Sequence, residues 1–216
     1  MVPRHPVQKQ APSKRGRPRR GTREAEILEA GFQEFAEKGF DAARLDEVAA
    51  RAGVAKGTLY LYCESKEALF EAAVRSRIQP VVGRVRRLAE FYPGPTRFLL
   101  RMIIRFMYRQ IARGELGAVM RIVISEGNRF PAITEFYHRE FIGQMNKLIE
   151  TIVAKGVARG EMRDGAATRL PMVIIGPGVM AAIWQMTFQP HHPIDLDAFY
   201  EAHVDLIMNG ISREST

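Results

Sequence analysis

The chain has 216 residues, of which 46% are hydrophobic and 26% are charged, so it is long enough for two domains with a buried core. Its single cysteine excludes an internal disulfide, and its most apolar segment, residues 171–184, is too short to cross a bilayer. These features predict a soluble, cytoplasmic protein without membrane contact. The formal net charge of +8 gathers in two basic segments, residues 1–20 and 80–113.

Residues 1–21 form a basic segment that we expect to be disordered in isolation, because it is rich in Pro, Gly and Gln and cannot bury a core. Seven Lys or Arg side chains and no acidic one lie within residues 1–20. The sequence Arg15-Gly16-Arg17-Pro18 resembles an AT-hook, in which Arg15 and Arg17 would point into a narrow minor groove of DNA. The alternative is a basic tail with a general attraction to phosphates.

An amphipathic helix is predicted over residues 23–38, with Thr22 as its cap and Gly39 at its end. One apolar stripe at helical spacing supports it: Ile27, Leu28, Gly31, Phe32, Phe35 and Ala36.

Residues 45–64 are typical of a helix-turn-helix. Gly53 occupies the corner between the two helices, where a positive φ favours glycine, and Val54 fills that corner. The apolar faces of the two helices are formed by Leu45, Val48, Ala49 and Ala52 and by Leu59 and Tyr62. The exposed face of the second helix, which can reach base edges and phosphates, carries Lys56, Gly57, Thr58 and Tyr60. An ordinary helical hairpin with a glycine corner is the structural alternative.

Residues 22–70 resemble the N-terminal domain of the TetR family of bacterial transcriptional regulators. The resemblance rests on Gly31, Phe32, Phe35, Gly39, Phe40, Glu47-Val48-Ala49, Ala52-Gly53-Val54, Lys56-Gly57-Thr58-Leu59-Tyr60 and Ser65-Lys66-Glu67-Ala68-Leu69. We expect the bases to be faced by Lys56, Gly57 and Thr58, and the resemblance implies phosphate contacts from Tyr60, Tyr62 and Lys66. Arg44 lies at the start of a helix where relatives usually carry Thr or Ser, and we expect its charge to reach a phosphate.

The rest of the chain is predicted to be helical throughout. Ser65 caps a fourth helix that runs towards Phe91 and that Pro80 should kink or interrupt. The later helices are expected at residues 96–112, 115–126, 131–158, 165–188 and 195–211. Cys63 is interpreted as a small buried hydrophobic residue, with a redox-sensing thiol as the alternative.

A stripe of arginines at four-residue spacing marks the first of these later helices: Arg97, Arg101, Arg105, Arg109 and Arg113. Like charges at that spacing repel one another. We expect solvent or acidic residues of a neighbouring helix to relieve the repulsion, and an acidic effector is the alternative.

The family resemblance implies a small-molecule pocket among the middle helices. Its candidate residues, each of which could instead be ordinary core packing, are Phe98, Met102, Phe106, Met120, Ile124, Phe136 and Trp184. The last two helices are expected to form a homodimer interface, because residues 170–188 are too apolar for a solvated surface. Gly176 and Gly178 would let the facing helices approach closely.

Enzyme motifs are missing from the sequence, which has no phosphate-binding loop, zinc-protease pattern or nucleophile elbow. His191-His192 lies between prolines without helical spacing, so we expect no metal and no cofactor.

We therefore predict an all-α protein of about nine helices: a basic arm (1–21), a helix-turn-helix domain (22–68) and an effector-binding and dimerisation domain (69–216). It would be a homodimeric regulator of transcription and not an enzyme, most simply a repressor that a small hydrophobic effector releases from a near-palindromic site on double-stranded DNA. An architectural, non-specific DNA-binding dimer without a ligand is the alternative from another class.

Overall fold

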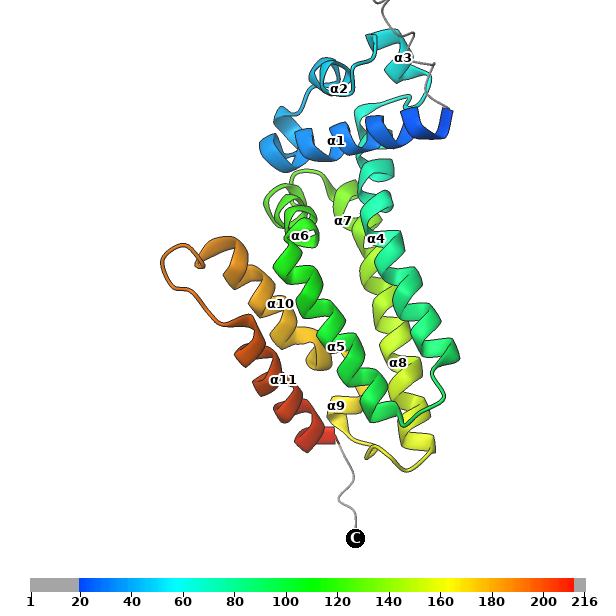
Figure 1. The fold of residues 1–216 in the computed structure, drawn as a ribbon, viewed down its shortest axis with the longest axis vertical. Helices are drawn as coiled ribbons and strands as arrows, with labels where there is room; N and C mark the ends of the chain where they lie inside the picture. Colours follow the sequence, from blue (N-terminus) through cyan, green and yellow to red (C-terminus); the bar gives the residue numbers. More distant parts are fainter. Residues whose placement is uncertain (1–19, 212–216) are drawn as a thin grey trace, which may run out of the picture.

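The computed structural model describes residues 20–211, which contain helices and no β-strand. The α-helices are α1 (Arg20–Ala42), α2 (Leu45–Arg51), α3 (Lys56–Tyr60), α4 (Lys66–Phe91), α5 (Thr96–Arg113), α6 (Glu115–Glu126), α7 (Pro131–Tyr137), α8 (Gly143–Ala158), α9 (Ala166–Arg169), α10 (Pro171–Thr187) and α11 (Leu196–Ile211). A π-helical turn, η1 (His138–Ile142), joins α7 to α8. Figure 1 shows α1 to α3 as a head at one end of an elongated body, with α4 running from the head into the body.

Most predicted helix boundaries agree with the structure, and the differences have local causes. The first helix begins at Arg20 rather than after Thr22, so Thr22 lies inside it and does not cap it. Gly39 has φ 79°, and this left-handed residue interrupts the helical backbone at the predicted end. The predicted helix 165–188 is divided into α9 and α10 at Leu170, because the proline at position 171 starts a new helix.

Prolines inside two helices do not end them. Pro80, where we expected a kink or an interruption, lies within α4, and Pro177 lies within α10. Each proline removes one backbone N–H donor from its helix.

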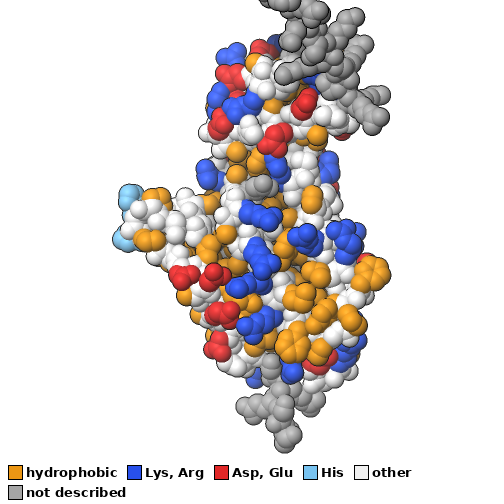
Figure 2. Space-filling view, in the orientation of Figure 1, with side chains coloured by type: hydrophobic (Ala, Val, Ile, Leu, Met, Phe, Trp, Pro, Cys, Tyr) orange, Lys and Arg blue, Asp and Glu red, His pale blue; other side chains and the backbone are white. Residues whose placement is uncertain are grey.

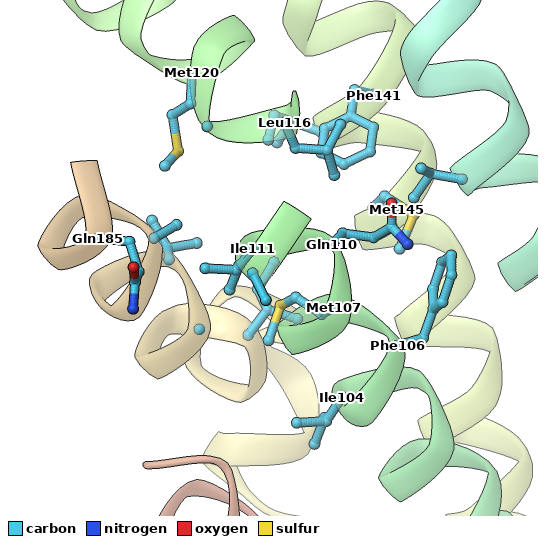
Figure 3. Close-up of a pocket in the computed structure, with 18 of the residues that line it drawn as sticks. Ile104, Phe106, Met107, Gln110, Ile111, Leu116, Met120, Phe141, Met145 and Gln185 are labelled. Atoms are coloured by element: carbon cyan, nitrogen blue, oxygen red, sulfur yellow. The ribbon is translucent and has the colours of Figure 1, made fainter. Parts of the chain in front are cut away.

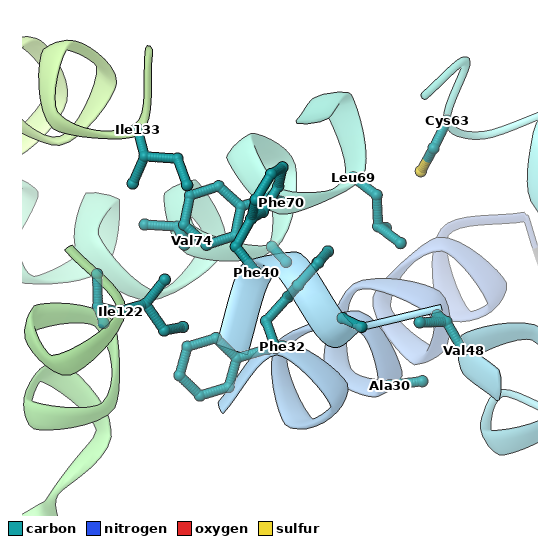
Figure 4. Close-up of a cluster of buried hydrophobic side chains, with 14 of the residues drawn as sticks. Ala30, Phe32, Phe40, Val48, Cys63, Leu69, Phe70, Val74, Ile122 and Ile133 are labelled. Atoms are coloured by element: carbon teal, nitrogen blue, oxygen red, sulfur yellow. The ribbon is translucent and has the colours of Figure 1, made fainter. Parts of the chain in front are cut away.

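Two clusters of buried hydrophobic side chains stabilise the fold. The first joins the head to the body, because Phe40 of α1 packs with Phe70 of α4 and lies in one cluster with Ile122 and Ile133 of α6 and α7 (Figure 4). The second lies between the far part of α4 and helices α5, α8, α10 and α11. Because α4 contributes to both clusters, it connects the head to the far part of the body.

Within residues 20–211, no helix is both long enough and apolar enough to cross a membrane.

Candidate nucleic-acid interface and cavity

The corner between α2 and α3 has the geometry that the sequence predicts. Gly53 adopts φ 64°, and the N–H of Val54 donates to the carbonyl oxygen of Ala49 at 2.9 Å, which turns the chain towards α3. Val48 of α2 and Leu59 of α3 are fully buried against α1 and α4. The exposed side of α3 is thereby fixed relative to the rest of the head.

Ion pairs attach α2 to α1 from the outside. The guanidinium of Arg51 contacts Glu37 with two hydrogen bonds, at 2.7 Å and 2.5 Å, and reaches the buried Glu34 at 3.4 Å. The Arg51 hydrogen bond holds the pKa of the Glu37 carboxyl below its usual value. A bidentate contact of this kind fixes orientation as well as distance, so α2 holds α3 in one position.

The predicted base-facing residues lie together at the start of α3. Lys56 and Gly57 are exposed, and a Cβ added to Gly57 would meet no atom, so its backbone is open to a partner. The Nζ of Lys56 lies 2.8 Å from a carboxylate oxygen of Asp46, and this contact raises the pKa of Lys56. Thr58 is half-buried and Tyr60 is 44% exposed.

The other predicted DNA contacts surround this surface. Arg44 is exposed directly before α2, and Tyr62 is half-buried against the head's core. Lys66 donates from Nζ to the carbonyl oxygen of Asp41 at 2.6 Å and lies 5.0 Å from the ring centre of Phe40. Arg15 and Arg17 lie outside the described residues.

A cavity of about 320 Å³ lies in the body between α4, α5, α6, η1, α8 and α10. Its walls are mainly apolar and include Met107, Leu116, Phe141 and Met145, as Figure 3 shows. This volume is at the lower end of the range of about 300–1,000 Å³ that is typical of small-molecule sites.

Sequence models of a known protein family match both the head and the body of this chain. A sequence model of bacterial regulatory proteins of the tetR family matches residues 27–73, which contain the helix-turn-helix. A second, described as the tetracyclin repressor-like C-terminal domain, matches residues 94–207. The two models together span most of the chain. The chain belongs to the TetR family.

Relatives of this TetR-family protein include other helix-turn-helix regulators. YdeS of Bacillus subtilis is 30% identical over 173 residues, which cover 76% of this chain and 80% of YdeS. The transcriptional repressor KstR2 of Mycolicibacterium smegmatis is 24% identical over 197 residues, which cover 89% of this chain and 92% of KstR2. The structure of FadR of Bacillus subtilis in complex with stearoyl-CoA has a TM-score of 0.72 at 21% identity and covers 86% of this chain and 98% of FadR.

Family membership establishes the general activity. This TetR-family protein is a regulator of transcription that binds DNA through its helix-turn-helix, dimerises and responds to small molecules. The relatives to which it is similar are regulators of transcription rather than enzymes.

The seven predicted pocket residues of the regulator do not come together. Phe106 and Met120 line the cavity. Phe98, Met102 and Ile124 are 46%, 43% and 60% exposed and are absent from its walls.

The two remaining candidates take part in other contacts. Phe136 is buried beside Phe70 in the cluster that joins head and body. Trp184 donates from its indole N–H to the carbonyl oxygen of His192 at 2.6 Å and packs on Phe188. The indole therefore supports the loop that follows α10.

The helical geometry of α5 explains why only one of its three candidate pocket residues lines the cavity. Side chains four residues apart are rotated by about 40° around a helix with 3.6 residues per turn. Phe98, Met102 and Phe106 follow this spacing, so the row turns from solvent at Phe98 to the cavity at Phe106.

Sequence reasoning missed several of the cavity's residues. Four of the ten methionines of the regulator line it: Met120, which was predicted, and Met107, Met145 and Met186, which were not. Gln110 and Gln185 add two side-chain amides. Methionine suits irregular gaps because its side chain is flexible, so the methionines of the predicted middle helices were the available signal.

The arginine stripe on α5 is relieved in part by acidic residues of α11, as we expected. Arg101 contacts Glu201 at 3.1 Å, and Arg105 contacts Asp197 at 2.9 Å. Figure 2 shows the basic side chains over α5 beside the acidic ones over α11. These pairs are largely exposed, and each contributes little to stability.

The last two long helices expose apolar side chains that a monomer would leave in water. Met172, Val173 and Met180 of α10 are 66%, 51% and 45% exposed, and Leu206 of α11 is 65% exposed. An apolar surface of this kind is typical of a protein interface.

The predicted role of Gly178 in this interface is contradicted by the structure. A Cβ added to Gly178 would overlap the side chain of Met107 in α5, so this glycine faces the interior of the same chain. A Cβ added to Gly176 meets no atom within 4 Å, so Gly176 keeps an open side. The difference arises because two residues along a helix point in nearly opposite directions.

Proposed function

We propose that this protein is a repressor that a mainly hydrophobic effector releases from its DNA site. The main support for this proposal is that α4 both lines the cavity and packs in the head. Val81 and Val85 of α4 line the cavity, while Leu69 and Phe70, at the start of the same helix, are buried in the cluster that holds α1. A ligand that displaces α4 therefore moves the surface that reads DNA.

Residue roles in DNA binding follow from the exposed surface of the head. Lys56, Gly57 and Thr58 face the bases, while Arg44, Tyr60, Tyr62 and Lys66 contact phosphates, and Arg15 and Arg17 of the basic arm reach into the minor groove. The head corresponds to residues 22–68 and the sensor to residues 69–216. Because its target is the bacterial chromosome, the protein works in the cytoplasm, and no catalytic step is part of its action.

The dimer forms through the exposed faces of α10 and α11. Two heads of one dimer then enter successive major grooves, which favours half-sites about 10–10.5 base pairs apart. In support of the effector's nature, FadR, whose fold is similar, is known in complex with stearoyl-CoA, and the cavity here is lined mainly by apolar side chains.

A selection of bound DNA from random sequence tests the reading function. We expect enrichment of a near-palindrome with half-sites one turn of the double helix apart. DNA without any preferred sequence, retained with a steep salt dependence, would instead identify an architectural binder.

A further inference from the structure

Two amides in the cavity lack hydrogen-bond partners. Gln110 of α5 and Gln185 of α10 line it, and neither side chain forms a hydrogen bond with a residue of 20–211. Figure 3 shows them on opposite sides of the cavity. Side-chain amides that face a cavity require polar partners, so a ligand or water must supply them.

A cation lies next to the cavity, at its α4–α5 end. Phe106, one turn before Gln110 on α5, lines the cavity, and the guanidinium carbon of Arg84 lies 5.2 Å from its ring centre. Val81 and Val85, which flank Arg84 on α4, also line the cavity. Arg84 is therefore held at the rim between α4 and α5.

The charge of Arg84 is not neutralised by the protein. It is exposed and forms no ion pair within residues 20–211, in contrast to Arg101 and Arg105, which contact acids of α11. Arg121 of α6, which itself lines the cavity, is likewise exposed and has no ion pair in that range.

Among the lining residues whose side chains the structure describes, none is Asp or Glu. The electrostatic environment of the site is thus positive at its rim and apolar inside. It favours a negative group at the entrance and opposes a cationic one.

We infer that the effector is an anionic amphiphile. Its hydrocarbon part occupies the apolar cavity, and its carboxylate or phosphate lies at the α4–α5 rim, where Arg84 contacts the charge and Gln110 donates to an oxygen. This inference rests on the proposed function, because it names the ligand class for the same cavity. It also explains how a ligand would act on α4 directly, since the anion is bound to a residue of that helix.

Titration calorimetry on the full-length protein without DNA tests the ligand class. The probes are dodecanoate, lauroyl-CoA, dodecanol and dodecyltrimethylammonium, all below their aggregation concentrations. Dodecanoate presents a carboxylate and lauroyl-CoA presents phosphates, so the two anions distinguish the sources of negative charge. We expect at least one anion to bind about tenfold or more tightly than dodecanol, because a hydrogen bond to a charged group contributes at least that factor. The cation should bind most weakly.

Arg84→Gln tests the position of the head group, with Arg87→Gln as its matched control. Arg87 is also an exposed arginine of α4 without an ion pair in residues 20–211. Neither arginine lines the cavity, but only Arg84 lies over the ring of Phe106, which does. Arg84→Gln should remove most of the preference for the anion, whereas Arg87→Gln should preserve it. Loss of the preference in Arg121→Gln instead would place the anion at the α6 side and overturn the assignment to Arg84.

The remaining outcomes separate this inference from the proposed function. Equal binding of dodecanol and dodecanoate would overturn the anionic ligand class, while the cavity would still be an effector site. Failure of every probe to bind would overturn the ligand class and count against a hydrophobic effector. Sequence-specific DNA binding by the same sample, measured by fluorescence anisotropy, would still support the reading function in either case.

Discussion

His203 joins three helices from a position that is almost closed to solvent. This α11 residue is 2% exposed, its Nε2 lies 2.8 Å from the carbonyl oxygen of Ile174 in α10, and its Nδ1 lies 3.1 Å from the hydroxyl of Tyr108 in α5. A carbonyl oxygen only accepts, so Nε2 carries the proton, and the Tyr108 hydroxyl donates to Nδ1. Burial raises the pKa of Tyr108 to about 12, which keeps this donor protonated.

Burial also lowers the pKa of His203, which makes stability depend on pH. The unfolded chain then binds a proton at a higher pH than the folded one, so the contribution is complete above the ordinary pKa of about 6.5 and is lost as the pH falls through the lowered value. The free energy of unfolding should decrease by about 1.4 kcal/mol for each pH unit between those two pKa values.

Thermal unfolding of the wild type and His203→Gln between pH 8 and pH 5 measures this effect. The variant should be less stable at pH 8, because it loses buried hydrogen bonds, and its midpoint should fall less on acidification. Parallel curves for the two proteins would contradict a neutral, buried His203.

Lys56 is the residue on which the base-reading assignment is most directly tested. Lys56→Ala should weaken binding to the selected operator by about 1–3 kcal/mol if the side chain reads a base edge. Lys147→Ala, which removes an exposed lysine from α8, is the control. Unchanged operator affinity of a folded Lys56→Ala dimer would refute the assignment.

At the scale of the elements, α10 separates two environments. One side, with Ile175, Gly178 and Ala182, lines the cavity, and the other exposes Met172 and Met180. Pro177 between them removes the N–H that would bond to the carbonyl oxygen of Val173. The backbone of α10 therefore lacks one helical hydrogen bond near its middle.

Met180→Glu tests that face, because a dimer would have to bury an unpaired charge. We expect sedimentation to show a large shift from dimer to monomer. Ile124→Glu, at an exposed apolar residue of α6, introduces the same charge away from the face and should leave the dimer intact. Dissociation by both variants, or by neither, would place the interface elsewhere.

Gly178→Leu tests the opposite side of α10. Because Gly178 packs directly on Met107, the larger side chain should overpack the interior and lower the free energy of unfolding by about 1–3 kcal/mol. Chemical denaturation measures this loss. Gly176→Leu, on the open side, should leave protomer stability less affected, and equal losses would contradict the assigned orientation.

At the scale of the whole molecule, the basic arm and the head would act on one DNA site. Each phosphate neutralised on duplex DNA changes the salt slope of log affinity by about 0.9. Deletion of residues 1–20 should therefore make the slope shallower by several units if most of its seven charges engage.

The arm's minor-groove contact makes a separate prediction. Arg15→Ala with Arg17→Ala should lower the affinity more for operators with A-tract flanks than for operators with G·C flanks, because a narrow groove concentrates negative potential. Anisotropy titrations on the two DNAs measure the difference. Equal losses would leave the arm as a general phosphate contact.

Local sequence patterns were sufficient to predict the fold of the head, α1 to α3. Gly53 at the corner, Leu59 beneath α3 and Ser65 at the start of α4 each specify a neighbouring turn or helix, and the backbone has few alternatives at such positions. The Ser65 hydroxyl accepts from the N–H of Ala68 as predicted. The family motifs in residues 22–70 also predicted the general activity, DNA binding by a regulator of transcription, because the residues that bind DNA are close together in the sequence.

Tertiary structure decided the cavity and the orientation of α10. Phe98 and Phe106 are equivalent in an isolated α5, and only the neighbouring helices determine which of them faces the cavity. From the sequence alone, Gly178 suits a contact between protomers. In the fold, Met107 of α5 lies against it instead. A sequence specifies the apolar stripe of each helix through its period, but the rotation of that stripe towards a cavity, a core or a partner depends on how all the helices pack together.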